Sequence, residues 1–181
     1  SPDIVWVGSG EGNPRNSASV GRGIYKTLDG GRTWNKLGLE KTERIHRIVL
    51  HPEDAQTAWV SAFGTSWGEN AERGVFKTTD GGATWQKILF VDERTGCSDL
   101  IIDPRNPDKL FASMWQHRRW PWSFKSGGPG SGLYRTLDGG TNWQRLDDSD
   151  GLPTGELGRI GLAISASSPN TIYALTEAKK S

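Results

Sequence analysis

The chain has 181 residues, with 22 lysines and arginines against 21 aspartates and glutamates, and a net charge of +1. This near-balance predicts neither nucleic acid nor an anionic membrane surface as a partner. No apolar run approaches the roughly 18 to 20 residues that span a bilayer, so no membrane span is expected. The single cysteine, Cys97, excludes an internal disulfide. The chain opens at Ser1 without an initiator methionine, so we expect a processed or truncated start.

One twelve-residue pattern occurs three times and organises the chain. It reads GIYKTLDGGRTW, GVFKTTDGGATW and GLYRTLDGGTNW, and its aspartates, Asp29, Asp80 and Asp138, are separated by 51 and then 58 residues. A second pattern, PDIVWVGSG, recurs as QTAWVSAFG, PDKLFASMW and PNTIYALTE. Repeats of this length predict a fold built from repeated structural units.

Each repeat is expected to supply four short β-strands. In the second repeat these are Ile45–Leu50, Thr57–Ala62, Gly74–Thr78 and a fourth that begins near Thr84. All are rich in β-branched or aromatic residues and are bounded by turn residues, and no segment has a sustained helical period. Four strands per repeat are typical of β-propeller blades, so we predict an all-β fold of four-stranded antiparallel blades.

The predicted blades follow one another along the chain. Residues 1–40 form a partial blade, 41–92 and 93–147 form complete blades, and 154–181 form the first two strands of a further blade. About three and a half blades are fewer than the four to eight of a closed propeller. Because both ends would leave bare sheet edges, we predict that blades from the rest of a longer chain, or from another chain, complete a seven-bladed or similar ring.

The aspartates and tryptophans of the first pattern are predicted to be structural. Asp-Gly-Gly between strands is a hairpin-turn signal, because glycine accepts positive φ and the carboxylate accepts hydrogen bonds from turn amides. The tryptophan is expected to pack within its blade or on the neighbouring one. A residue that is required at three equivalent places serves the fold rather than one catalytic event. These residues are Asp29, Trp34, Asp80, Trp85, Asp138 and Trp143.

The pattern S/T-x-D-G-G-x-T-W resembles the Asp box, or bacterial neuraminidase repeat. It stands here as Thr27–Trp34, Thr78–Trp85 and Thr136–Trp143, with Asn142 in place of threonine in the third copy. The whole chain looks most like sortilin-type and xyloglucanase-type propellers, including large secreted bacterial proteins. The resemblance implies a propeller fold and an extracellular, periplasmic or cell-surface location, and it leaves the function open.

Three long connections between second and third strands are expected to share one face and to carry the binding site. They are Gly8–Gly23, Gly64–Gly74 and Met114–Gly132, whereas hairpin loops usually have two to five residues. Aromatic faces beside guanidinium groups suit sugar rings or peptides. The alternative is that these aromatic side chains pack on one another. We predict a groove between the second and third blades, formed by Trp67, Trp115, Arg118, Arg119, Trp120 and Trp122.

Catalytic and metal-binding residues are harder to assign from the sequence. Glycoside hydrolysis usually needs two carboxylates roughly 5 to 10 Å apart. The weak candidates are Glu69 and Asp99, and nothing in the sequence selects a pair. Asp147-Asp148-Ser149-Asp150 is dense in oxygen ligands but lacks the twelve-residue calcium-loop pattern, so we expect a solvated turn. No metal site and no cofactor are predicted.

These features favour a non-catalytic propeller that binds a glycan or protein ligand on the long-loop face, outside the cytoplasm. A rigid ring with decorated loops is sufficient for that function. The alternative is a glycoside hydrolase that resembles xyloglucan-cleaving propeller enzymes. The sequence leaves the choice between enzyme and binding module open.

Overall fold

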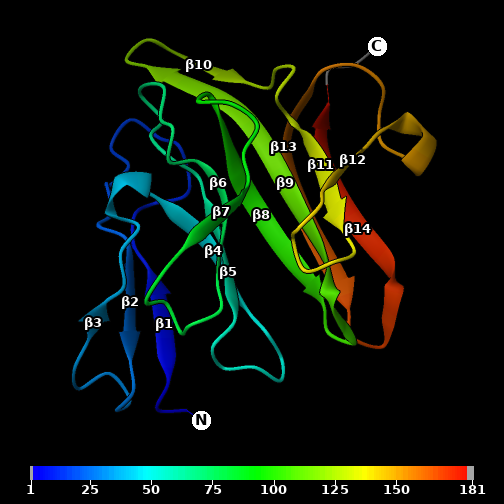
Figure 1. Ribbon diagram of the computed structural model, residues 1–181. Helices are drawn as coiled ribbons and strands as arrows, with labels where there is room; N and C mark the ends of the chain where they lie inside the picture. The colour runs from blue at the N-terminus through cyan, green and yellow to red at the C-terminus, as the bar shows by residue number, and fades with distance from the viewer. Residues whose placement is uncertain (1, 179–181) are drawn as a thin grey trace.

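Short strands separated by glycine-rich turns form four antiparallel sheets in the computed structural model, which describes residues 2–178 (Figure 1). The first sheet contains β1 (Val5–Gly8), β2 (Ile24–Thr27) and β3 (Asn35–Lys36). The second contains β4 (Ile45–Leu50), β5 (Ala58–Ala62), β6 (Gly74–Thr78) and β7 (Gln86–Leu89). In both sheets each strand pairs with the next one along the chain, as the repeat predicts.

The third sheet carries an extension that the repeat does not predict. Its blade strands are β8 (Thr95–Asp103), β9 (Asn106–Trp120), β11 (Gly132–Thr136) and β12 (Gln144–Leu146). Residues 117–120 of β9 run past the blade and pair with the added strand β10 (Ser123–Ser126). Met114–Gly132 is therefore not the loop that the sequence analysis expects, because much of it is a β-ribbon.

The fourth sheet has two strands, β13 (Leu157–Ser165) and β14 (Ser168–Ala178), and the last three residues predicted for it lie outside the described part of the chain. Helix within residues 2–178 is limited to two single-turn 3-10 helices, η1 (Glu40–Thr42) and η2 (Asp148–Asp150). None of the described helices is long and apolar enough to cross a membrane. The prediction of an all-β fold built from antiparallel sheets is confirmed.

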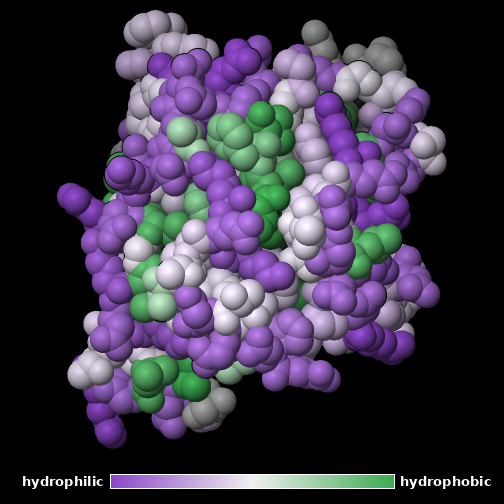
Figure 2. Space-filling view, in the orientation of Figure 1, coloured by the Kyte–Doolittle hydropathy of each residue, from purple (hydrophilic) through white to green (hydrophobic). Residues whose placement is uncertain are grey.

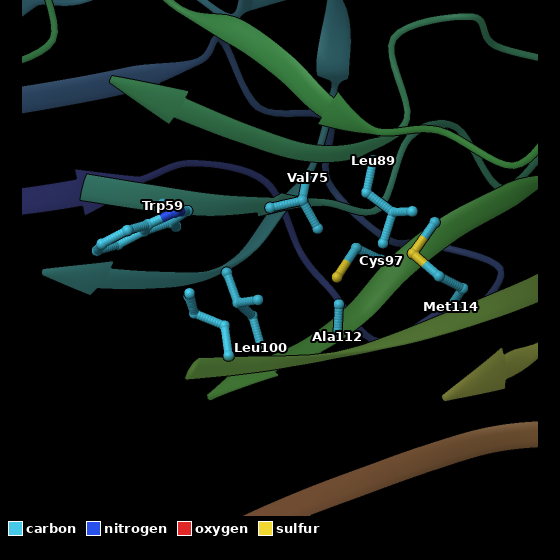
Figure 3. Packing of buried hydrophobic residues seen from close by; sticks show 8 residues of the cluster. Trp59, Val75, Leu89, Cys97, Leu100, Ala112 and Met114 are labelled. Carbon is cyan, nitrogen blue, oxygen red and sulfur yellow. The ribbon is translucent and has the colours of Figure 1, made fainter. Parts of the chain in front are cut away.

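The core lies between neighbouring sheets. Figure 3 shows the largest cluster, in which Trp59 and Val75 of the second sheet face Leu100, Ala112 and other residues of the third. Trp59 is only 1% exposed. Similar apolar clusters join the first sheet to the second and the third to the fourth. Burial of apolar side chains between flat sheets therefore stacks the blades side by side.

The Asp-box turns are closed by a repeated side-chain network. In the second blade, the Thr78 hydroxyl donates to the Asp80 carboxylate at 2.7 Å and accepts the Gly82 N–H at 3.0 Å. The same carboxylate accepts the Thr84 N–H at 2.9 Å. In the third blade Asn142 replaces threonine and keeps the bond, because its side-chain amide donates to Asp138 at 2.7 Å.

The second and third Asp-box turns also contact the preceding blade. The Lys26 ammonium donates to the Gly81 carbonyl at 3.2 Å, and the Lys77 ammonium donates to the Gly139 carbonyl at 2.9 Å. The Trp59 indole N–H donates to that same Gly139 carbonyl at 3.1 Å. The Gly81 and Gly139 carbonyls occupy equivalent places in their turns. Each accepts a lysine ammonium from the preceding blade and so joins two neighbouring blades.

The box tryptophans differ in their surroundings. Trp85 packs edge-on against Trp6 of the preceding blade, with ring centroids 6.3 Å apart, and its indole N–H donates to the Leu37 carbonyl at 2.7 Å. Trp143 packs against the cluster between the second and third sheets. Trp34 is 44% exposed and donates to Gly31 in its own turn.

We expect Thr78→Val to lower the free energy of unfolding by about 1–3 kcal/mol, because valine keeps the shape but leaves the buried Gly82 N–H without an acceptor. Urea denaturation measures the change. Thr141→Val is the matched control, since the exposed Thr141 hydroxyl bonds only to the Asp138 carbonyl. Equal stability of the two variants would contradict the structural role of the network.

Stability is expected to fall in acid because the box aspartates are ionised in the fold. The Thr33 hydroxyl, the Thr33 N–H and the Thr27 hydroxyl lower the pKa of Asp29 to about 2, and hydrogen bonds lower the pKa of Asp80 and Asp138 as well. A lowered folded-state pKa stabilises above the unfolded value of about 3.9, and that contribution is lost as the pH falls through the folded pKa. Denaturation midpoints should therefore drop between about pH 4 and pH 2. Asp29→Asn should flatten the drop, and an unchanged acid profile would count against this origin.

Candidate binding pocket

The three long connections meet at the end of the sheets opposite the Asp-box turns (Figure 1). The Arg119 N–H donates to the Ser66 carbonyl at 2.8 Å, and the Arg119 guanidinium donates to the Pro14 carbonyl at 2.6 Å. The Asn70 N–H donates to the Glu93 carbonyl at 2.8 Å, which joins the β5–β6 connection to the β7–β8 connection. Segments from three sheets therefore build one surface, and Figure 2 shows that this end is largely hydrophilic.

One face of the β9–β10 ribbon is packed with aromatic rings. Side chains alternate between the two faces of a strand, and Trp115 and His117 lie on the face that covers Phe63. The Phe63 ring lies 4.1 Å from His117 and 5.5 Å from Trp115, and Trp115 lies 5.8 Å from Phe124. Burial, with the nearby Arg73 charge, lowers the pKa of His117 to about 3, so its ring is neutral near pH 7.

The opposite face of the ribbon, together with His117 from the packed face, lines a cavity of about 510 Å³. That volume is within the roughly 300–1,000 Å³ of small-molecule sites. Arg118 and Trp120 are two residues apart on β9 and share this face, and the Arg118 guanidinium lies 5.6 Å from the Trp120 ring centre. Lys125 of β10 pairs directly with Arg118. Other walls come from the β5–β6 and β7–β8 connections. The lining comprises Gly68, Glu69, Arg94, Gln116, His117, Arg118, Trp120, Lys125 and Gly127.

A buried arginine holds one wall of this cavity in place. Arg73 is fully buried at the end of the β5–β6 connection, and its guanidinium donates to the backbone carbonyls of Phe63, Thr65, Gly68 and Arg94. Burial lowers the pKa of Arg73 to about 10, so it remains charged near neutral pH. Planar, multidentate donors of this kind fix an irregular backbone that has no strand partner.

Two of the predicted ligand-binding residues, Trp115 and Arg119, are not among the residues that line the cavity, so their role in binding stays a prediction. Trp115 is 3% exposed, and its indole N–H donates to the Ser126 hydroxyl at 3.0 Å. The Arg119 guanidinium lies 4.4 Å from the Phe124 ring centre and is bonded to Pro14. Both side chains project from the packed face of the ribbon. Successive side chains of a strand point to opposite faces, and Trp115 and Arg119 are an odd number of positions away from Arg118 and Trp120.

The remaining predicted residues divide between the cavity and its surroundings. Arg118, Trp120 and Glu69 line it. Trp67 and Trp122 are 37% and 82% exposed and are not among the lining residues, so their role in binding stays a prediction.

Asp99 is part of the framework between blades. Its carboxylate accepts the Leu100 and Leu162 N–H groups, both at 2.9 Å, and lies 3.0 Å from the Arg47 guanidinium. It is 6% exposed and does not line the cavity with Glu69. The structure therefore does not bring the two weak catalytic candidates together.

Sequence reasoning misses Arg94, Lys125 and Arg73. A hairpin with its turn at Pro121-Trp122 would have placed Lys125 of the following Ser123–Ser126 segment opposite Arg118. Arg73 gives no such signal, because its role depends on which carbonyls surround it.

The acidic segment Asp147–Asp150 is built as a capped turn. The Asp147 carboxylate accepts the Ser149 N–H at 2.9 Å, and the Asp150 carboxylate accepts the Asp147 N–H at 3.1 Å. These carboxylates satisfy backbone donors at the start of η2. No group of three or more metal-ligating side chains is found in residues 2–178.

Comparison with known proteins places the chain in a family. The family model described as Sortilin-Vps10 (sortilin, neurotensin receptor 3) matches residues 22–180. The chain belongs to the Sortilin-Vps10 family. It is also 26% identical over 144 residues to a xyloglucanase of Paenibacillus sp, covering 75% of this chain and 13% of that protein. A probable oligoxyloglucan-reducing end-specific xyloglucanase of Neosartorya fischeri is 24% identical over 153 residues, covering 80% and 17%.

Solved structures show the same fold. The xyloglucanase of glycoside hydrolase family GH74 from Xanthomonas campestris matches 98% of this Sortilin-Vps10 chain and 25% of its own, with a TM-score of 0.68 at 14% identity. The GH74 enzyme of Niastella koreensis matches 92% and 22%, with a TM-score of 0.60 at 21% identity. The predicted resemblance to sortilin-type and xyloglucanase-type propellers is confirmed. The chain spans less than a fifth of the length of the two curated relatives.

We expect Arg73→Met to loosen the cavity wall. The Thr65 and Gly68 carbonyls would lose their donor, and each buried acceptor left unpaired costs about 1–3 kcal/mol. Hydrogen–deuterium exchange should rise over residues 64–74, and the unfolding midpoint should drop. Arg105→Met is the control, because Arg105 is exposed and its guanidinium makes a single hydrogen bond, to the Ser167 carbonyl. Unchanged exchange in the Arg73 variant would contradict the anchoring role.

Proposed function

We propose that this propeller segment binds a glycan in the cavity beside the β9–β10 ribbon and does not cleave it. The main support is the composition of the cavity lining, in which the Trp120 ring lies beside the Arg118 guanidinium on the β9–β10 strand pair. Aromatic faces stack on the C–H faces of sugar rings, and guanidinium groups direct hydrogen bonds to their oxygens. The resemblance to large secreted propellers supports a site of action outside the cytoplasm.

The distribution of carboxylates favours binding over hydrolysis. Two carboxylates facing each other across a cleft are the usual requirement for glycoside cleavage. Among the residues that line the cavity, Glu69 is the one carboxylate. Asp99 is committed to two backbone N–H groups and to Arg47, so using it as an acid or nucleophile would break contacts between blades.

Hydrolysis is the second candidate, and two observations support it. The curated relatives are named as xyloglucanases, and Glu69 is exposed at the cavity wall. A catalytic partner for Glu69 would then come from outside the lining described here. Since the chain spans only 13% and 17% of those relatives, their activity is carried over as a hypothesis only.

We further propose that additional blades cover the last sheet, from the same longer chain or from another one. Tyr173 and Leu175 of β14 are 65% and 84% exposed. Large apolar side chains at such exposure are typical of surfaces that pack against a neighbour. A further blade would bury these side chains in an apolar cluster like those between the other neighbouring sheets.

We expect Trp120→Ala to weaken binding of a glycan oligosaccharide at least tenfold in calorimetry, because the stacking surface is lost, while the unfolding midpoint stays close to that of the parent protein. A panel of xyloglucan, cellulose and uronate oligosaccharides supplies the ligands. Trp34→Ala is the matched control, since Trp34 is partly exposed at the opposite, Asp-box end.

Chromatography of the same mixtures distinguishes the two functions. Binding without products supports the binding module. Products that disappear in Glu69→Gln would instead establish the hydrolase. If Trp120→Ala bound the glycan normally but had a lower unfolding midpoint, Trp120 would have a structural role rather than a binding role.

A further inference from the structure

The cavity concentrates positive charge that the chain as a whole does not have. The net charge of the protein is +1, yet the lining carries Arg94, Arg118 and Lys125 against the single carboxylate of Glu69. Arg94 lies 4.0 Å from Asp92. Within residues 2–178, neither Arg118 nor Lys125 forms an ion pair. Two unpaired cations therefore face one cavity.

The placement of these two cations is costly for the fold. Arg118 and Lys125 are direct cross-strand partners in the antiparallel β9–β10 pairing. Like charges directly opposite each other destabilise a strand pair, and within residues 2–178 no acid forms an ion pair with either cation. An anion seated between them would remove that cost and would gain charge-assisted hydrogen bonds from both.

The neutral part of the lining indicates what carries the anion. The Arg118 guanidinium lies 5.6 Å from the Trp120 ring centre, so a planar fork stands beside a flat apolar surface. Gln116 and Gly127 also line the cavity. A ligand that matches has a carboxylate for the fork, a C–H face for the ring and hydroxyls for the remaining polar groups. A hexuronate residue of a polysaccharide has all three.

We propose that the cavity selects acidic glycans and binds a uronic acid residue through its carboxylate, a specificity that rests on the proposed glycan-binding function. Arg118 offers a bidentate fork to the carboxylate, and Lys125 offers a point charge from the facing strand. The exposed Arg94 adds long-range attraction. Selection for the carboxylate is separate from selection among sugars. Stacking on Trp120 requires only an apolar C–H face, so it accepts many sugar rings.

The experiment compares an oligogalacturonate with its full methyl ester, since the two share every ring and hydroxyl and differ only in charge. Calorimetry on the protein should give at least tenfold tighter binding of the acid, and the difference should shrink as salt rises. Arg118→Gln and Lys125→Gln should each weaken binding of the acid more than binding of the ester, so that the preference for the acid falls. Arg32→Gln, which removes an exposed cation at the Asp-box end, should leave the preference intact.

Each other outcome overturns a defined part of the proposal. Equal binding of acid and ester, or tighter binding of neutral xyloglucan oligosaccharides, would overturn the selection for acid and leave glycan binding standing. No binding of any glycan would overturn both. Binding of a peptide with a free carboxyl terminus, lost in the peptide amide and without binding of uronate, would show that the cations serve a protein ligand.

Discussion

The closed Asp-box turn is the interaction on which the rest of the structure depends. A threonine hydroxyl and an aspartate carboxylate use up the amide groups of the turn, as Thr78 and Asp80 do in the second blade. The Gly81 carbonyl is left free to accept the Lys26 ammonium of the preceding blade. One such turn therefore closes a hairpin and also aligns two sheets, which explains why the same few residues recur in the first three sheets.

That rigidity at one end of the sheets leaves the other end free to vary. Apolar clusters between sheets and Asp-box contacts fix the blades without using the long connections. The connections are instead held by local devices, of which Arg73 and its four carbonyl acceptors are the clearest. The cavity thus lies where sequence change costs the fold least, as is usual for sites on repeat scaffolds.

The sequence predicts the structural features that recur in several blades, and it fails for the features that occur only once. Four-stranded blades and box turns follow from spacing, because every copy must satisfy the same amides. The β9–β10 ribbon breaks the repeat, so its tryptophans and arginines look alike in the sequence although strand alternation separates them. Trp115 and Arg119 face the packed side, whereas Arg118 and Trp120 face the cavity, and only the pairing register distinguishes these sets.

The two carboxylates that first suggest catalysis have opposite physical situations. Asp99 is buried and satisfied by two amides and Arg47, so its charge stabilises the packing of the third sheet against the fourth. Glu69 is exposed on a wall that cations dominate, where it balances part of their charge. In the proposed complex the cations of this wall would bind the anion, and Glu69 is the one carboxylate among the lining residues. Because Arg118 and Lys125 face each other across the strand pair without an ion pair in residues 2–178, the proposed acidic ligand would stabilise the ribbon that binds it, and recognition would be coupled to local order.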